Sequence, residues 1–228
     1  MEKHLTRWRK KLIVFVFGLM IIFSSSLPII NAQDVTIPLV DIVANIRQDG
    51  SVEITEKRTI QFDGDFTYGF YELPKAKNGE LTDFSLSDES ITYQYDSMGS
   101  KLSGTYYQED LGATWKYYYY FQASNTTKTF TIRYILKNVI MLYEDYGQFY
   151  YQLQGSGWNY TIGSFTSVIK WQTPVSMDNY RIWAHGPLWG EFTKTDDNSA
   201  NLIVNDLPAS TMVEVRVLLP RNYFSTSP

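Results

Sequence analysis

Three carboxylate residues, Asp63, Asp65 and Glu72, lie in the stretch QFDGDFTYGFYELP (residues 61–74) and could bind a hard cation. A calcium loop would need further oxygen ligands and a glutamate at a longer, fixed spacing from the first aspartate. Here Glu72 comes too early, and aromatic residues occupy the intervening positions. Asp-Gly is also a common dipeptide of tight turns. We therefore interpret residues 63–64 as a turn between two strands, and we predict no bound metal or cofactor.

A second possible chemistry is glycan hydrolysis, which needs two carboxylates that converge across a cleft. The candidates are Glu56, Glu72, Glu144 and Asp145. Glu56 and Arg58 interrupt the apolar face of a predicted strand, where residues two apart are neighbours. This spacing favours a mutually neutralised pair near the edge of a sheet. A buried carboxyl group poised for catalysis is the alternative.

Other catalytic arrangements have little support in the sequence. There is no cysteine, which excludes disulfides, thiolate metal sites and thiol nucleophiles. His185 is the single histidine after residue 32, and Ser156 lies in Gly-Ser-Gly, which lacks the nucleophile-elbow pattern. Neither a glycine-rich phosphate loop nor a zinc-binding spacing is present. We therefore expect a protein that is not an enzyme and has no catalytic residues.

The secondary structure that must position these residues is predicted to be β-strand, because apolar and polar side chains alternate with a period of two. The alternation is clearest over residues 51–62, and Asp49-Gly50 is expected to join this strand to residues 39–48 through a two-residue hairpin turn. Residues 137–143 are a short helical candidate. Further strands are predicted at residues 91–95, 103–108, 114–122, 127–136, 148–154, 165–172, 180–184, 191–194, 201–205 and 212–219. The pattern predicts an all-β fold, an antiparallel β-sandwich of the immunoglobulin-like or jelly-roll-like kind.

Aromatic residues make up 16% of the chain, and two groups of them matter here. Phe66, Tyr68 and Phe70 alternate, which predicts that they fill the core from one side of a strand. The run at residues 117–120 is four tyrosines. In a strand, Tyr117 and Tyr119 would share one face and Tyr118 and Tyr120 the other. One face in the core and one at the surface is the simpler interpretation, and an exposed platform for stacking sugars is the alternative.

The first 32 residues form a separate segment. Basic residues at positions 7–11 precede the apolar run LIVFVFGLMIIF (residues 12–23), and small residues follow up to Ala32. This is the pattern of a secretory signal peptide, with cleavage predicted after Ala32; an uncleaved N-terminal anchor is the alternative. Both interpretations export the remainder of the chain.

The charge of the exported part argues against several partners. Residues 33–228 carry 15 Lys and Arg against 23 Asp and Glu. An acidic domain without a basic block is a poor binder of phosphate backbones, so we expect no nucleic-acid partner. We also expect no contact with anionic lipid except through residues 1–32, if these are retained.

Three stretches together resemble a known family: DGSVEITEKRTIQFDGDFTYGFYELP (49–74), YEDYGQFYYQLQGSGWNYTIGSFTSVIKWQTP (143–174) and LPASTMVEVRVLLP (207–220). They are similar to the exported N-terminal domain of a bacterial predicted membrane protein family, domain of unknown function 2207. The matching positions are Asp49, Gly50, Ser51, Glu56, Phe62, Asp63, Gly64, Phe66, Gly69, Tyr71, Pro74, Tyr143, Gly155, Gly157, Trp158 and Pro174.

The resemblance implies a β-sandwich outside the membrane, with no known reaction. It also implies structural roles for the signature residues, and Gly69 is expected to permit a close backbone approach or a bulge. Typical members continue into transmembrane helices and a glycine-rich cytoplasmic tail, whereas this sequence stops at Pro228. That departure favours a truncated member, or an exported domain that is free or held by its N-terminus.

The sequence thus predicts a signal segment (1–32), a β-sandwich domain (33–220) and a polar tail or linker (221–228). We expect a secreted or membrane-tethered module at the bacterial cell envelope that interacts with a membrane protein or an envelope glycan. A carboxylate-dependent glycan hydrolase and a sensor ectodomain are the alternatives. The candidate binding residues are Tyr117, Tyr118, Tyr119, Tyr120 and Trp158. The residues expected to be structural are Asp49, Gly50, Glu56, Asp63, Gly64, Gly69, Pro74, Gly157 and Trp158.

Overall fold

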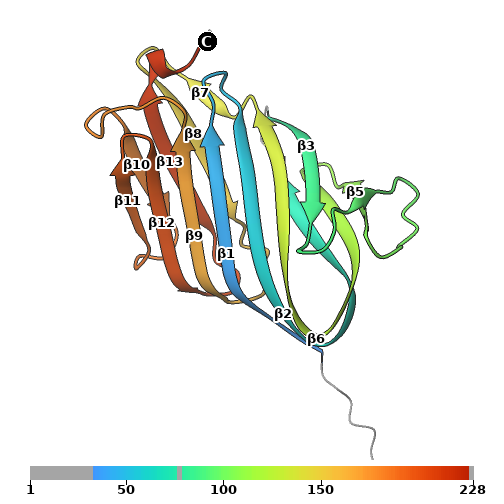
Figure 1. Cartoon of the computed structure of the whole chain (residues 1–228). Helices are drawn as coiled ribbons and strands as arrows, with labels where there is room; N and C mark the ends of the chain where they lie inside the picture. The colour runs from blue at the N-terminus through green and yellow to red at the C-terminus, as the bar shows by residue number, and fades with distance from the viewer. Residues whose placement is uncertain (1–32, 76–78, 226–228) are drawn as a thin grey trace, which may run out of the picture. The chain divides into compact units, whose positions relative to one another are not determined.

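The computed structural model describes residues 33–75 and 79–225, and its regular structure is almost entirely β-strand (Figure 1). The predicted signal segment, residues 1–32, lies outside the described residues. The all-β prediction is confirmed. The elements are β1 (Asp34–Ile46), β2 (Val52–Pro74), β3 (Glu80–Ser87), β4 (Gln94–Tyr95), β5 (Thr105–Asp110), β6 (Thr114–Lys137), β7 (Ile140–Leu142), β8 (Tyr146–Gln154), β9 (Ile162–Trp171), β10 (Arg181–His185), β11 (Glu191–Asp196), β12 (Ser199–Leu207), β13 (Val213–Pro220) and the 3₁₀ helix η1 (Arg221–Tyr223).

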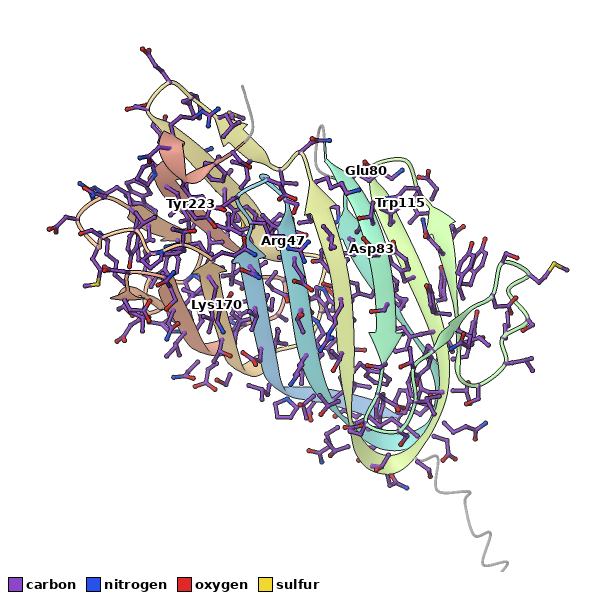
Figure 2. All side chains as sticks on the ribbon, turned by 45° about the horizontal axis from the view of Figure 1, so that its top comes forward. Arg47, Glu80, Asp83, Trp115, Lys170 and Tyr223 are labelled. Atoms are coloured by element: carbon purple, nitrogen blue, oxygen red, sulfur yellow. The ribbon has the colours of Figure 1, made fainter. Side chains whose placement is uncertain are left out.

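The strands form two sheets that enclose one core. The larger sheet has the order β11-β12-β9-β1-β2-β6-β5-β4, with β3 also paired to β6, and the smaller has the order β10-β13-β8-β7. Apolar side chains from both sheets, among them Ile42 and Ile54 from the larger and Phe149 and Val215 from the smaller, belong to one buried cluster. Figure 2 draws the side chains on both sheets.

The larger sheet is mixed rather than purely antiparallel, which differs from the sequence prediction. β1 pairs antiparallel with β2 but parallel with β9, from Ile37 opposite Ile162 to Ile46 opposite Trp171. β4 and β5 are also parallel. β1 and β9 are far apart along the chain, so alternation within each strand does not reveal that they are parallel neighbours.

The predicted hairpin of β1 and β2 is confirmed, with a longer loop than expected. The last residue pair is Ile46 and Val52, so five residues connect the strands. Within the loop, the Gly50 N–H donates to the Arg47 carbonyl at 3.1 Å, and Gly50 has the positive φ of 80° that the turn requires. The Asp49 carboxylate accepts from the backbone N–H and hydroxyl of Ser51, and these bonds lower the pKa of Asp49.

The predicted turn at residues 63–64 is wrong, because β2 continues through it to Pro74. On β6, Thr126 pairs with Phe62 and Ser124 with Asp65, so Asp63 and Gly64 together face a single residue in a β-bulge. Gly64 has a φ of 98°, and its N–H donates to the Asn125 side chain at 2.8 Å. A bulge keeps both strands paired while bending them, and Asp-Gly suits it as well as it suits a turn.

Other predictions for the strands need correction. Residues 114–122 and 127–136 are parts of the single strand β6, which also bends at the bulge. Residues 137–143 contain the short strand β7 instead of a helix, and β3 was not predicted. The register of β2 against β6 shifts a second time between Phe66 and Tyr68. After this shift, the odd-numbered residues of β2 face inward instead of the even-numbered ones. As a result Phe66 packs on the core, but Tyr68 and Phe70 are exposed.

The segment after β13 also differs from the polar tail that we expected. Tyr223, labelled in Figure 2, and Phe224 are both buried. The Tyr223 hydroxyl donates to the Ile46 carbonyl at 2.7 Å and accepts from the Gln172 N–H at 3.1 Å. The Ser225 N–H donates to the Gln48 carbonyl at 2.8 Å. Residues 221–225 are therefore part of the domain, because two aromatic side chains fix them to it.

Candidate functional site

The candidate site exists because β2 doubles back on itself. Glu56 and Tyr71 are 15 residues apart on this one strand, and a straight strand would separate them by roughly 50 Å. Instead the Tyr71 hydroxyl donates a hydrogen bond to the Glu56 carboxylate. β6 bends with β2, and the two strands curl together at the bulge, at the lower end of the molecule in Figure 1. The second half of this ribbon thus faces its own first half.

A buried ion pair occupies the inner face of the bend. Glu56 and Arg58 are 1% and 2% exposed, and Arg58 Nε donates to the Glu56 carboxylate. The pairing predicted from their spacing is confirmed, but its expected place near a sheet edge is wrong, because β2 lies between β1 and β6. Arg58 Nη2 donates to the side-chain oxygen of Gln154 at 2.8 Å, which connects the pair to the smaller sheet.

One nitrogen of this cluster is left without a partner. Among the described residues, Arg58 Nη1 is the only buried side-chain nitrogen with no hydrogen-bond partner. A buried donor in this state is destabilising, because it has lost its hydrogen bonds to water. The guanidinium lies 4.1 Å from the ring centroid of Trp158, which covers it, and 5.6 Å from that of Tyr71. Burial lowers the pKa of Arg58, but the charge of Glu56, the nearby Tyr71 and the hydrogen bond to Glu56 together outweigh this effect, so the pKa of Arg58 is raised.

A cavity of about 570 Å³ opens beside this cluster, and Arg58, Tyr71 and Trp158 are among its lining residues. The volume falls within the range of small-molecule binding pockets. Its walls come from β1, β2, β6, β8 and the loop after β8. The apolar and aromatic lining includes Val35, Ile37, Ile60, Phe62, Phe66, Leu73, Phe121 and Leu153.

Tyrosine hydroxyls supply most of the other polar groups near the pair. Burial, followed by the Glu56 carboxylate, raises the pKa of Tyr71 well above its usual value. Tyr134 and Tyr151 share a hydrogen bond of 3.2 Å, and burial raises the pKa of Tyr151 to about 12 and that of Tyr134 further. Burial likewise raises the pKa of Tyr119. All four hydroxyls are therefore neutral over the physiological range.

The carboxylates considered for glycan hydrolysis do not converge in this structure. Glu56 is held by Arg58 and Tyr71, whereas Glu72 pairs with Lys116 at 3.0 Å. Glu144 and Asp145 precede β8, roughly 25 Å along that strand from Gln154.

The remaining catalytic candidates are also dispersed. Ser156 lines the cavity, and His185 lies on β10 with its ring 6.1 Å from that of Tyr150. Asp63 and Asp65 flank Gly64 in the bulge. Within the described part of the chain, no group of three or more His, Asp or Glu is placed to hold a metal ion.

The tyrosine run divides between the two faces of β6, as its alternation suggested. Tyr117 and Tyr119 are buried, and Tyr118 and Tyr120 lie half-buried on the opposite face. There they form an aromatic ladder with residues of β2 and β5, which we define as Tyr68, Phe70, Tyr107, Tyr118 and Tyr120. Ring centroids are 6.5 Å apart for Tyr68 and Tyr120, and 6.3 Å apart for Phe70 and Tyr118.

Four of the family-signature residues, Gly69, Pro74, Gly157 and Trp158, line the cavity. A Cβ on Gly69 would come within 2.7 Å of Tyr119 Cζ, so the expected close approach at Gly69 is found. Pro74 ends β2, Gly157 and Trp158 lie in the loop after β8, and all three line the cavity.

Sequence reasoning did not identify Tyr71 or Gln154 as members of the site. Gln154 faces inward because a register shift near Leu153 interrupts the alternation of β8. The family resemblance includes Tyr71 among the matching positions, and this match was the one signal in the sequence that pointed to Tyr71.

The fold and the cavity define a β-sandwich domain with a built pocket at the bend of its longest strands. The chain belongs to the family described as the predicted membrane protein (DUF2207) N-terminal domain, which it matches over residues 36–219. None of the curated proteins that we compared matches the chain.

Two solved structures are similar to this chain at very low sequence identity. A candidate nutrient-binding protein from Legionella pneumophila aligns with a TM-score of 0.50 and 9% identity, over 80% of this chain and 66% of that one. An M1 zinc metallopeptidase from Deinococcus radiodurans aligns with a TM-score of 0.45 and 7% identity, over 79% of this chain and 42% of that one. The chain thus spans less than two thirds of either protein.

Within residues 33–75 and 79–225, we find no helix with the length and apolar character needed to cross a membrane.

Proposed function

We propose that this protein is a non-enzymatic, exported binding module of the bacterial cell envelope, and that the cavity beside Arg58 is its binding site. The observation that carries the proposal is a buried, cavity-lining arginine with one unpartnered nitrogen, in a pocket of ligand size. Proteins do not commonly keep such a donor, and ligand-binding pockets combine apolar walls with a few polar groups of this kind. The dispersal of the carboxylates supports binding over hydrolysis.

The cavity can be tested with the uncharged fluorescent probe Nile red. We expect saturable binding to the wild-type protein and much weaker binding to a Gly155→Phe/Gly157→Phe variant. Both glycines line the cavity, and a Cβ on either has no contact closer than 3.9 Å, so the added rings enter open space. Thr193→Phe on the exposed side of β11 is the control and should bind normally. Unchanged binding by the cavity variant would contradict the proposal.

Export is tested by the intact mass of the native protein in membrane and culture-fluid fractions. A form that starts at Gln33 in the medium would support a released domain. A membrane-bound form that retains residues 1–32 would support a tethered one. Cytosolic protein with an intact N-terminus would contradict export in either form.

The aromatic ladder favours a second candidate function, contact with an envelope glycan. Exposed tyrosine rings stack on sugars while their hydroxyls remain in water. If this is correct, Tyr118→Ala/Tyr120→Ala should lose retention on insoluble cell-wall polysaccharide, whereas Tyr150→Ala, an exposed tyrosine on the smaller sheet, should not. Equal retention of the two variants would count against the glycan contact.

A further inference from the structure

We infer that the ligand of the cavity is an uncharged amphiphile: an acyl chain with one ester or amide carbonyl that accepts a hydrogen bond from Arg58 Nη1. This inference rests on the proposed function and adds the chemistry of the ligand.

The walls of the cavity favour an acyl chain over a peptide or a glycan. Peptides and sugars carry many polar groups, and each one that is buried without a partner is destabilising. The deep polar groups of the cavity are largely occupied with one another, since Tyr134 pairs with Tyr151 and Tyr71 donates to Glu56. The lining is otherwise rich in apolar and aromatic side chains. The lining also includes the polar side chains of Gln33, Thr114, Gln152, Ser156 and Asn159. Arg58 Nη1 is the one fully buried side-chain nitrogen without a partner among the described residues, and it matches a ligand with one acceptor.

The charge of the cluster favours an uncharged head group. The Glu56 carboxylate already neutralises Arg58, and both side chains are almost fully buried. A carboxylate or phosphate ligand would leave a net negative charge in a poorly solvated site, beside Glu56 and in an acidic domain. A neutral carbonyl oxygen satisfies the Nη1 donor without adding charge.

Trp158 controls access to this donor. Its ring lies over the guanidinium, so the carbonyl reaches Nη1 after the ring has moved aside. The Trp158 backbone carbonyl is held by the Ser210 N–H at 2.7 Å, while the adjacent Gly157 has open space around its Cα. The Trp158 ring itself packs against the core, with its centroid 6.3 Å from that of Tyr71, and it lines the cavity, so its fluorescence should respond to the ligand.

The test is competition against Nile red at about pH 8 with four probes of similar chain length. They are 1-monooleoylglycerol (a neutral ester), N-oleoylethanolamine (a neutral amide), oleate (an anion) and 1-octadecene (no acceptor). We expect the ester, the amide or both to bind at least about tenfold more tightly than oleate and 1-octadecene. A hydrogen bond to a charged donor contributes at least that factor in affinity. Preference between the ester and the amide distinguishes a glycerolipid from an N-acylated compound.

The outcomes separate this inference from the proposed function. If Nile red itself does not bind in the cavity, the proposed function fails. If Nile red binds but oleate or 1-octadecene competes as well as the neutral carbonyl probes, the function stands and the ligand class is wrong. Displacement by the peptide Leu-Leu-Leu and by none of the acyl probes would overturn the ligand class as well.

Two variants test the role of Arg58. Replacing the pair by apolar residues, Glu56→Leu/Arg58→Met, should retain Nile red binding and abolish the preference for the ester over 1-octadecene. As a measurement that does not depend on this variant, 1-monooleoylglycerol should change the tryptophan emission of the wild-type protein. Trp158→Phe should lose this change and Trp189→Phe, at an exposed site outside the cavity, should keep it. A preserved preference in the first variant, or a preserved change in Trp158→Phe, would refute the contact.

Discussion

Gly69 lies directly against the ring of Tyr119 on the neighbouring strand. A Cα hydrogen of Gly69 takes the position where any other residue has its Cβ atom. A Cβ there would be 2.7 Å from Tyr119 Cζ and 2.8 Å from its hydroxyl oxygen. Tyr119 is buried and lines the cavity, so the close approach of Gly69 sets one wall of the site.

Gly69→Ala should lower the free energy of unfolding by about 1–3 kcal/mol, because the Tyr119 ring must move within a packed core. The measurement is urea denaturation. Gly157→Ala is the control, since a Cβ at Gly157 has no neighbour within 4 Å. A Gly69→Ala/Tyr119→Leu variant should recover part of the loss, and strictly additive effects would contradict the contact.

Glu56→Ala should be severely destabilising, by about 3–5 kcal/mol, because it leaves the Arg58 charge buried and unpaired. Glu53→Ala is a matched control on the same strand. Its pair with Arg47 is at the surface, with side chains 39% and 30% exposed, so the loss should stay near 0–1 kcal/mol. Thermal unfolding of both variants measures the contrast, and a similar loss in the two would disprove the buried charge at Arg58.

Alkaline pH should unfold the protein through its buried tyrosines. The pKa values of Tyr71, Tyr134 and Tyr151 are raised on folding, so their stabilising contribution is complete below the unfolded pKa of about 10. It is lost as the pH rises from there towards the folded values. The free energy of unfolding should fall steeply above about pH 10 and less steeply in Tyr71→Phe. An equal slope in the two proteins would exclude Tyr71 as a contributor.

Phe224→Ala should destabilise the domain by about 3 kcal/mol, since a buried ring is removed from the core. The ring lies over Gly147 on β8, where a Cβ would collide with it. Leu188→Ala is the control, because Leu188 is fully exposed. If the melting temperature of Phe224→Ala equals that of the wild-type protein, residues 221–225 are not an integral part of the fold.

The alternation over residues 51–62 was sufficient to predict the central hairpin, because a half-buried strand displays its own period. The same reasoning divided β6 into two strands, with a break at residues 123–126. Polar residues at a bulge resemble those of a turn, and only pairing with β2 shows that the strand continues.

The candidate site was predictable to the same limited extent. The Glu56–Arg58 pair follows from two charges on one face of a strand. Tyr71 reaches Glu56 only because both long strands bend between them, and Gln154 faces inward only because of a register shift in β8. Each of these contacts depends on an irregularity in the pairing of two strands. The sequence of one strand by itself does not specify where such an irregularity occurs.

The tie between Ser225 and Gln48 has a mechanical consequence. β1 enters at one end of the sandwich and runs 13 residues, about 40 Å, before the loop at the other end, where Ser225 is bound (Figure 1). A force applied between residue 33 and residue 225 therefore acts lengthwise on the sandwich, through β1 at one end and through η1 and β13 at the other, and β1 is hydrogen-bonded on both sides, to β2 and to β9. Such a load shears many hydrogen bonds at once instead of opening them one by one, so the domain should resist extension and act as a stiff spacer.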